Sequence, residues 1–448
     1  MSSDATTDGD APDTRASRTA PENEVVIEAT GLKKHFDQSS GVVDRLLGAS
    51  STVKAVDGVD LRVREGETLA VVGESGCGKS TLGETLLNLQ TATEGSVRYR
   101  GEELTGRSGR EMRPFRRQLQ MVFQDPLASL NPRQTVGDVV TAPMEVHDGG
   151  DADQRTARAE ELLELVGLER GHMDRYPGQF SGGQQQRVGI ARALSVEPEL
   201  IVADEPVSAL DVSVQAQILN LLDGLRAELG LSLLFITHDL SVVRHIADRV
   251  AVMYLGEIVE TAPTDELFAD PRHPYTKSLL SAVPRIDPGA RTDRTILPGT
   301  VPSPIDPPTG CRFHTRCPAV IPPEDWTGDQ DAFRAVFTFR NRLIDGDIDP
   351  TATAARLGTD DEGAIADHVI ERSLDVSLAA LPTVAAETIE EAARLIAADD
   401  LDAARTRLAE AFPSPCEELT PARVDRENDG WTACHRLDDD APGRPELR

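Results

Sequence analysis

The sequence contains no run of about 18 apolar residues, the length that a helix needs to cross a lipid bilayer, so we expect no membrane-spanning segment. It also contains no run of basic residues, which argues against a nucleic-acid partner. Residues 1–24 have neither a basic nor an apolar stretch, and we interpret them as a disordered acidic tail rather than a secretion signal. These absences predict a protein that stays in the cytosol.

Lysine is scarce: five of the 46 basic residues are Lys, which leaves 41 Arg, against 76 acidic residues and a net charge of −30. Acidic, Lys-poor surfaces stay soluble where salt screens charges over a few ångströms. We therefore interpret the composition as adaptation to a salty cytoplasm, that is, a halophilic source. An acidic surface that docks a basic partner is the alternative.

Apolar and amphipathic segments alternate between residues 25 and 265. Strands are expected at 25–36 (an edge strand and a turn), 61–63, 68–73, 96–101, 119–123, 199–204 and 232–238, with two more in 250–262. Helices are expected at 80–89, 214–229 and 240–250 and over most of 133–196, with a loop at 37–52. Strands that alternate with helices predict an α/β fold with a mainly parallel sheet, and the stretch at about 125–180 predicts a separate helical subdomain.

The chain changes character after about residue 265. Residues 283–323 are rich in proline and predict an extended, turn-rich segment. Residues 320–412 are acidic with helical spacing of apolar residues, and cysteines flank them on both sides. We therefore expect 320–412 to be a helical insertion into one C-terminal unit formed by 266–319 and 413–448.

A glycine-rich segment joins the expected strand at 68–73 to the expected helix at 80–89. It fits G-x-x-x-x-G-K-S, the phosphate-loop pattern, in the strand-to-helix context that this pattern requires. Backbone N–H groups and the positive end of the helix would bind phosphates, while a chance glycine turn is the alternative. We expect Lys79 to reach the β- and γ-phosphates and Ser80 to bind Mg²⁺. The expected nucleotide contacts are Gly73, Ser75, Gly76, Cys77, Gly78, Lys79, Ser80 and Thr81.

The apolar strand at 199–204 ends in an acidic residue, Asp204, and a second one, Glu205, follows it. Carboxylates at the carboxyl edge of such a sheet lie beside the phosphate loop. Asp204 suits Mg²⁺ binding, and Glu205 suits polarising the attacking water as a general base. An exposed carboxylate pair is the alternative, but the apolar strand that leads into the two residues argues against it.

Further motifs make the sequence resemble the ATPase subunits of ABC transporters. Residues 180–187, Phe-Ser-Gly-Gly-Gln-Gln-Gln-Arg, resemble the signature motif of that family. Its expected nucleotide contacts are Ser181, Gly182, Gly183 and Gln184. Phe36 resembles the aromatic residue that stacks on adenine, and Gln124 resembles the Q-loop glutamine, which acts in catalysis and at Mg²⁺. Asp211 closes a D-loop-like segment, and His238 resembles the switch histidine.

This resemblance implies that residues 25–265 form an ABC ATPase domain that dimerises head to tail, with each ATP between one phosphate loop and the signature motif of the other subunit. Because this chain holds one phosphate loop, a second ABC ATPase subunit is implied, and the form of the signature motif favours a paralogue and a heterodimer. The other implied partners are two transmembrane permease subunits, contacted through Gln124–Val140, and indirectly an extracytoplasmic substrate-binding protein. The implied location is the cytoplasmic face of the membrane.

Residues 273–284, HPYTKSLLSAVP, resemble the C-terminal extension of the oligopeptide/dipeptide/nickel importers. Peptides are the implied cargo, with nickel or oligosaccharides as alternatives. A soluble ABC ATPase of DNA repair or translation is a further alternative. Members of the first type carry long coiled coils, but the interval 80–180 lacks sustained heptads. Members of the second type usually carry two ATPase cassettes, but this chain has one phosphate loop. An exporter subunit is disfavoured by the HPYT segment.

Four of the five cysteines lie near the C-terminus: Cys311, Cys317, Cys416 and Cys434. Four thiolates can hold Zn²⁺ or a [4Fe–4S] cluster, and unligated buried cysteines are the third alternative; the spacing alone does not separate them. The segments GCRFHTRCP and TACH resemble the iron–sulfur segment of some peptide-importer ATPases, which implies a [4Fe–4S] cluster. The 98 residues between Cys317 and Cys416 depart from that pattern, so the insertion must loop out and return.

Overall fold

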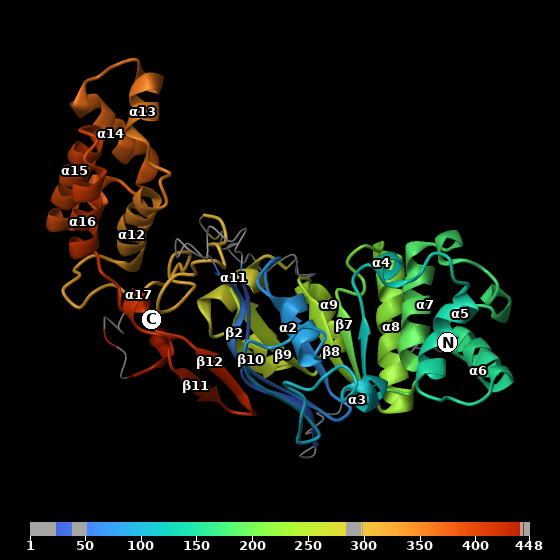
Figure 1. Ribbon diagram of the computed structural model, residues 1–448. Helices are drawn as coiled ribbons and strands as arrows, with labels where there is room; N and C mark the ends of the chain where they lie inside the picture. The colour runs from blue at the N-terminus through green and yellow to red at the C-terminus, as the bar shows by residue number, and fades with distance from the viewer. Residues whose placement is uncertain (1–23, 38–51, 284–296, 298, 440–441, 443–448) are drawn as a thin grey trace, which may run out of the picture.

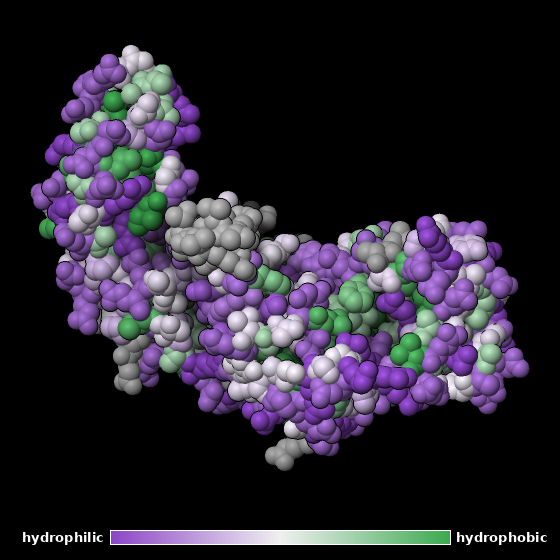
Figure 2. All heavy atoms as spheres, in the orientation of Figure 1, coloured by the Kyte–Doolittle hydropathy of each residue, from purple (hydrophilic) through white to green (hydrophobic). Residues whose placement is uncertain are grey.

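The computed structural model describes residues 24–37, 52–283, 297, 299–439 and 442. The expected acidic tail, apart from Glu24, and residues 38–51 of the expected loop lie outside this part. The molecule is elongated and bent: a helical lobe lies at one end, sheets in the middle, and a helical arm at the other end (Figure 1). On the face seen in Figure 2, hydrophilic residues predominate and hydrophobic ones form small scattered groups.

The central sheet has eight strands in the order β11-β12-β10-β9-β3-β8-β7-β6. Their bounds are β3 (Thr68–Val72), β6 (Leu119–Val122), β7 (Leu200–Asp204), β8 (Ser232–Thr237), β9 (Arg249–Tyr254), β10 (Glu257–Pro263), β11 (Arg423–Arg426) and β12 (Gly430–Ala433). From β9 to β6 the neighbouring strands are parallel, and from β9 to β11 they are antiparallel. The predicted α/β fold with a mainly parallel sheet and antiparallel edge strands is confirmed.

A second, antiparallel sheet has the order β2-β1-β4-β5, with β1 (Val25–Asp37), β2 (Thr52–Arg64), β4 (Glu94–Tyr99) and β5 (Glu102–Glu103). The prediction of β1 as an edge strand was wrong, because β1 pairs with β2 on one side and with β4 on the other. The expected strand at 61–63 is the last part of the longer β2. Helix α2 (Lys79–Leu86) shares a buried core with strands of both sheets.

The stretch at about 125–180, expected to be a helical subdomain, lies in a helical lobe beside β6 and β7 (Figure 1). Its helices are α4 (Pro126–Ser129), α5 (Val136–Val146), α6 (Ala152–Leu165) and α7 (Gly182–Leu194), with short 3-10 turns at Arg170–His172 and Pro177–Gln179. Helices α5 and α6 each begin with a capping box, which satisfies N–H groups of the first turn. Helix α7 shares a core with α8 (Val212–Leu229), so the lobe is packed against the sheet domain. A shorter helix, α3 (Arg113–Gln118), precedes β6.

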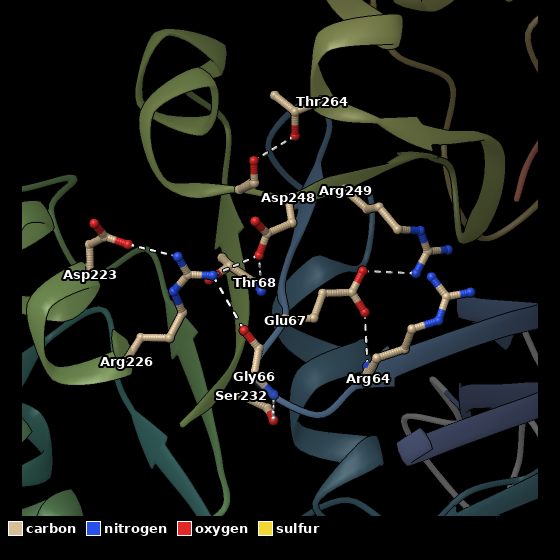
Figure 3. A network of polar contacts seen from close by, with 11 residues as sticks. Arg64, Gly66, Glu67, Thr68, Asp223, Arg226, Ser232, Asp248, Arg249 and Thr264 are labelled. Atoms are coloured by element: carbon tan, nitrogen blue, oxygen red, sulfur yellow. Dashed lines mark hydrogen bonds and ion pairs between the residues drawn. The ribbon is translucent and has the colours of Figure 1, made fainter. Parts of the chain in front are cut away.

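A polar network holds the first residues of β3 (Figure 3). Asp248 accepts hydrogen bonds from the Thr68 N–H at 2.9 Å and from Arg226 of α8 at 2.7 Å. Glu67 pairs with Arg249 at 3.0 Å. These contacts explain why the helix expected over 240–250 is shorter: α9 (Leu240–Ile246) ends before Asp248, and Arg249 begins β9.

The expected helical insertion is an arm of five helices (Figure 1). They are α12 (Gln330–Ile344), α13 (Pro350–Leu357), α14 (Glu362–Ser373), α15 (Thr383–Ala397) and α16 (Leu401–Ala411). The two ends of the arm meet, because Ser414 Oγ donates to the Ile321 carbonyl at 2.7 Å and the Cys311 N–H donates to the Cys416 carbonyl at 2.8 Å. The segments before and after the arm therefore lie side by side.

The C-terminal unit begins with α10 (Thr264–Ala269) and α11 (Pro274–Ser281), and the short α17 (Pro415–Glu418) follows the arm. The hairpin β11–β12 then extends the central sheet, with Glu260 of β10 opposite Thr432. The strands expected from the sequence do not include these two. Within the described residues, no helix combines the length and apolar character needed to cross a bilayer.

Candidate nucleotide-binding site

A cavity of about 990 Å³ opens where β3 meets α2. The predicted site residues that line it are Phe36, Gly73, Ser75, Gly76, Gly78, Lys79, Ser80, Thr81, Gln124, Glu205 and His238. They come from segments more than 200 residues apart in the sequence, and the carboxyl ends of the parallel strands β3, β7 and β8 bring them together. Phe36 is 36% exposed at the cavity, with the Lys34 ammonium 4.7 Å from its ring centre.

The phosphate loop is a tight turn between the buried strand β3 and α2. Gly78 has φ +105°, and a Cβ there would lie 1.9 Å from the Ala55 carbonyl oxygen, so only glycine fits. Lys79 Nζ donates to the carbonyls of Gly73 at 2.9 Å and Glu74 at 3.0 Å. The buried ammonium is thus held inside the loop, at the N-terminus of α2, where a helix attracts anions.

Ser80 and Asp204, predicted to bind Mg²⁺, lie side by side, with Ser80 Oγ donating to Asp204 Oδ1 at 3.0 Å. Asp204 ends β7 and is 5% exposed. Burial raises the pKa of this carboxyl, and the hydrogen bond from Ser80 opposes the rise. A hydroxyl and a carboxylate are ligands that Mg²⁺ prefers, so the pair suits a hard cation.

Two of the predicted catalytic side chains converge on the third. Gln124 Nε2 donates to Glu205 Oε2 at 2.9 Å, and His238 Nδ1 lies 3.0 Å from Glu205 Oε1. Glu205 has a positive φ of 43°, and its N–H donates to the Ile236 carbonyl of β8 at 2.9 Å. Such strained backbone is retained where the surrounding structure fixes it, often at functional sites. The carboxylate is therefore fixed at the cavity next to Asp204.

Comparison with known proteins identifies the family. Residues 56–208 match the ABC transporter family, and residues 259–322 match the family "Oligopeptide/dipeptide transporter, C-terminal region". The chain is 54% identical to the putative oligopeptide transport ATP-binding protein YkfD of Bacillus subtilis, over 66% of this chain and 88% of the relative. It is 52% identical to the oligopeptide transport ATP-binding protein OppF of Escherichia coli, over 66% and 90%, and 49% identical to the dipeptide transport ATP-binding protein DppF of that species, over 65% and 86%.

The chain belongs to the ATP-binding subunits of the oligopeptide/dipeptide ABC transporters. It is accordingly an ATP hydrolase, as the resemblance of its motifs implied.

The signature motif of this ABC subunit lies outside the cavity. Ser181 caps α7, and the Ser181 N–H donates to Gln184 Oε1 at 3.0 Å. Ser181 and Gly182 are exposed, whereas Gly183 packs against Val214 of α8. The N-terminus of α7 is therefore open to a partner.

Two other residues predicted to contact the nucleotide, Asp211 and Cys77, also lie outside the cavity. Asp211 caps α8 by accepting hydrogen bonds from the N–H groups of Ser213 and Val214. The hydrogen bond from the Ser213 side chain, followed by those from the backbone, lowers the pKa of the Asp211 carboxyl. Cys77 is 2% exposed in the core below the phosphate loop, and burial raises its pKa. Neither side chain lines the cavity.

Sequence reasoning missed seven residues of the cavity wall: Val53, Ala55, Glu74, Ser208, Ala209, Leu279 and Pro304. Glu74 lies inside the recognised loop pattern, whose variable positions carry no expectation of their own. Leu279 and Pro304 come from the C-terminal unit, and no local pattern marks them as site residues.

The four C-terminal cysteines line one small cavity between α11, α17 and the residues around β12. Burial raises the pKa of all four thiols, and neighbouring thiolates add to the rise at Cys311, Cys317 and Cys434. The described residues include no group of three or more His, Cys, Asp or Glu side chains that could hold a metal ion. The predicted iron–sulfur and zinc ligation is therefore not supported by the geometry. Residues 330–429, which include Cys416, match a domain of unknown function, DUF8228.

Proposed function

We propose that this subunit binds Mg·ATP in the cavity at the phosphate loop and hydrolyses it to drive the import of oligopeptides or dipeptides. The convergence of Gln124 and His238 on Glu205, beside the Ser80–Asp204 pair, is the observation that carries the proposal. The names of the relatives, oligopeptide and dipeptide transport proteins, support the peptide cargo. Nickel and oligosaccharides are the alternative cargoes.

Each residue has a task in this proposal. The phosphate loop and Lys79 bind the phosphates, and Phe36 stacks on adenine. Ser80 and Asp204 would hold Mg²⁺, with Gln124 at its edge; the ion supplies charge neutralisation for the phosphates. Glu205 accepts a proton from the attacking water as general base, while Gln124 and His238 orient its carboxylate.

The Glu205→Gln variant tests this assignment. The amide keeps the shape of the side chain but cannot accept the proton, so we expect unchanged ATP binding by calorimetry and a loss of at least about 100-fold in ATPase turnover. Glu197→Gln is the matched control, because Glu197 also has a positive φ but lies outside the cavity. Turnover of Glu205→Gln equal to that of the control would sink the general-base role.

The exposed N-terminus of α7 supports the proposal that the site is completed by a second ABC ATPase subunit. Ser181, Gly182, Gly183 and Gln184 would face the γ-phosphate bound by that partner, where the helix end and its N–H donors stabilise negative charge. Asp211 would lie in the same interface. The remaining proposed partners are two permease subunits, contacted through Gln124–Val140 at the cytoplasmic face of the membrane, and indirectly a substrate-binding protein. Purification without any permease would favour the alternative of a soluble ABC ATPase.

We also propose that the four C-terminal cysteines hold a [4Fe–4S] cluster. Zinc bonds to sulfur are about 2.3 Å long, so a single ion needs four sulfurs in close contact, and no such group exists in the described residues. The four thiols, those of Cys317 and Cys416 buried, line one cavity, and each could bind one iron of a cluster there. This cavity also lies where the ends of the 320–412 insertion meet, which supports 266–319 and 413–448 as one unit.

Metal analysis after purification without oxygen tests the cluster. We expect about four irons and four acid-labile sulfides per chain, with Cys416→Ser losing iron and Cys77→Ser, a cysteine outside the group, keeping it. Stoichiometric zinc would replace the cluster by a zinc site. If neither metal is found, the four cysteines are ordinary packing residues.

A further inference from the structure

An arginine of the C-terminal unit reaches into the phosphate loop. Arg316, which directly precedes Cys317, donates from Nη1 to Glu74 Oε2 at 2.6 Å and from Nη2 to Glu74 Oε1 at 3.1 Å. Arg316 is 6% exposed, and Glu74 lies at the cavity wall between Gly73 and Ser75. A paired, two-bond contact of this kind fixes the direction of both side chains.

A second residue of the same unit holds the backbone of Glu74. The Glu74 N–H donates to Tyr275 Oη of α11 at 2.9 Å. Tyr275 is fully buried and packs edge-on against Tyr254 of β9 at 4.7 Å, and both rings contact Phe313 at 5.2 Å between ring centres. The position of Glu74 is therefore set by the C-terminal unit through both its carboxylate and its backbone.

The charge of Glu74 matters because the cavity receives a triphosphate. A carboxylate at the cavity wall repels the phosphates unless a cation neutralises it, and Coulomb energies are larger in such a partly buried site than in water. Arg316 supplies that cation and does not itself line the cavity. Its loss would expose the triphosphate to the Glu74 charge and release the carboxylate from its fixed place.

We propose that Arg316 is a positioning residue for ATP binding: it neutralises and orients Glu74 of the phosphate loop, so that the C-terminal unit controls the ATP affinity of the site. This inference rests on the proposed function, because it assumes that ATP binds in this cavity. Because Cys317 directly follows Arg316 in the chain, a change in the position of Cys317 would also move the residue that contacts Glu74.

Calorimetric titration of the full chain with Mg·ATP tests the inference. We expect Arg316→Gln to bind ATP about tenfold more weakly than the wild type, and the loss to shrink as salt is raised, because salt screens the repulsion. The double variant Arg316→Gln/Glu74→Gln removes the repelling charge and should recover to within about threefold of the wild type. Arg316→Lys keeps the positive charge and should also remain within about threefold, so it tests the idea even if Arg316→Gln does not fold.

Arg340→Gln is the matched control. Arg340 of α12 is buried like Arg316 and pairs with Glu417, and it does not line the nucleotide cavity. We expect its ATP affinity to equal that of the wild type. Equal losses in Arg340→Gln and Arg316→Gln, or a double variant as weak as Arg316→Gln, would overturn the positioning role. Wild-type affinity in Arg316→Gln would overturn the inference alone, whereas a wild-type protein that binds no ATP would overturn the proposed function.

Discussion

A buried ion pair between Arg426 and Glu260 joins the hairpin β11–β12 to β10. Arg426 is 3% exposed in its side chain, Glu260 is fully buried, and Arg426 Nη1 lies 2.6 Å from Glu260 Oε1. Glu260 also accepts from the N–H groups of Arg272 at 2.9 Å and His273 at 3.0 Å. The carboxylate therefore joins the hairpin, β10 and the start of α11.

Truncating Arg426 to alanine leaves this carboxylate buried without its cation. Breaking one partner of a buried pair costs about 3–5 kcal/mol, and a two-stranded hairpin has little stability of its own. We expect the free energy of opening the hairpin to fall by about that amount in Arg426→Ala. Arg423→Ala is the matched control on the same strand: Arg423 is 41% exposed, pairs with Asp60 and lies over Trp431, contacts worth about 1 kcal/mol.

Native-state hydrogen exchange of residues 423–433 measures this local opening directly, without assuming that the whole chain unfolds in one step. If these amides are equally protected from exchange in Arg426→Ala and Arg423→Ala, the argument from the buried pair is wrong. The double variant Arg426→Met/Glu260→Gln provides a second check, because removing both charges should recover part of the lost protection.

Two further predictions concern the phosphate loop and α11. In Gly78→Ala the new Cβ would meet the Ala55 carbonyl oxygen at 1.9 Å, so ATP binding in a titration should be lost. Gly76→Ala, with no atom within 4 Å of its Cβ, should weaken binding by about 30-fold or less, which corresponds to about 1–2 kcal/mol of backbone strain. Similar affinities would contradict the steric argument. Burial and the charge of Lys277 lower the pKa of His273 from 6.5 to about 3. Between pH 6.5 and 3 the unfolded chain binds a proton at this residue and the folded chain does not. The free energy of unfolding should therefore fall as the pH drops from 6.5 to 3. His273→Asn keeps an acceptor for the Tyr275 N–H but does not titrate, and an unchanged pH dependence of its thermal unfolding would refute this assignment.

The core of the fold could be predicted because its signals are local. The buried strands β3, β7 and β8 are continuous apolar runs, and their bounds lie within one residue of the expected ones. Two errors, the edge position expected for β1 and the length expected for α9, have a tertiary cause. The pairing of β1 on both sides depends on β4, and the early end of α9 depends on the contacts of Asp248 with Thr68 and Arg226. No short window of sequence contains either partner.

In the candidate site, too, short motifs could be predicted from the sequence, whereas contacts between distant segments could not. The residues and order of the phosphate loop, the Asp204–Glu205 pair and the family motifs were readable from the sequence by itself, because each motif is a short segment whose chemistry depends on its own residues. Only the tertiary structure decided that Arg316 neutralises Glu74, 242 residues away, and that Arg426 binds Glu260 across 166 residues. Contacts between distant segments depend on how the chain closes around its core, and an arginine that makes one has the same local sequence signal as an arginine in solvent.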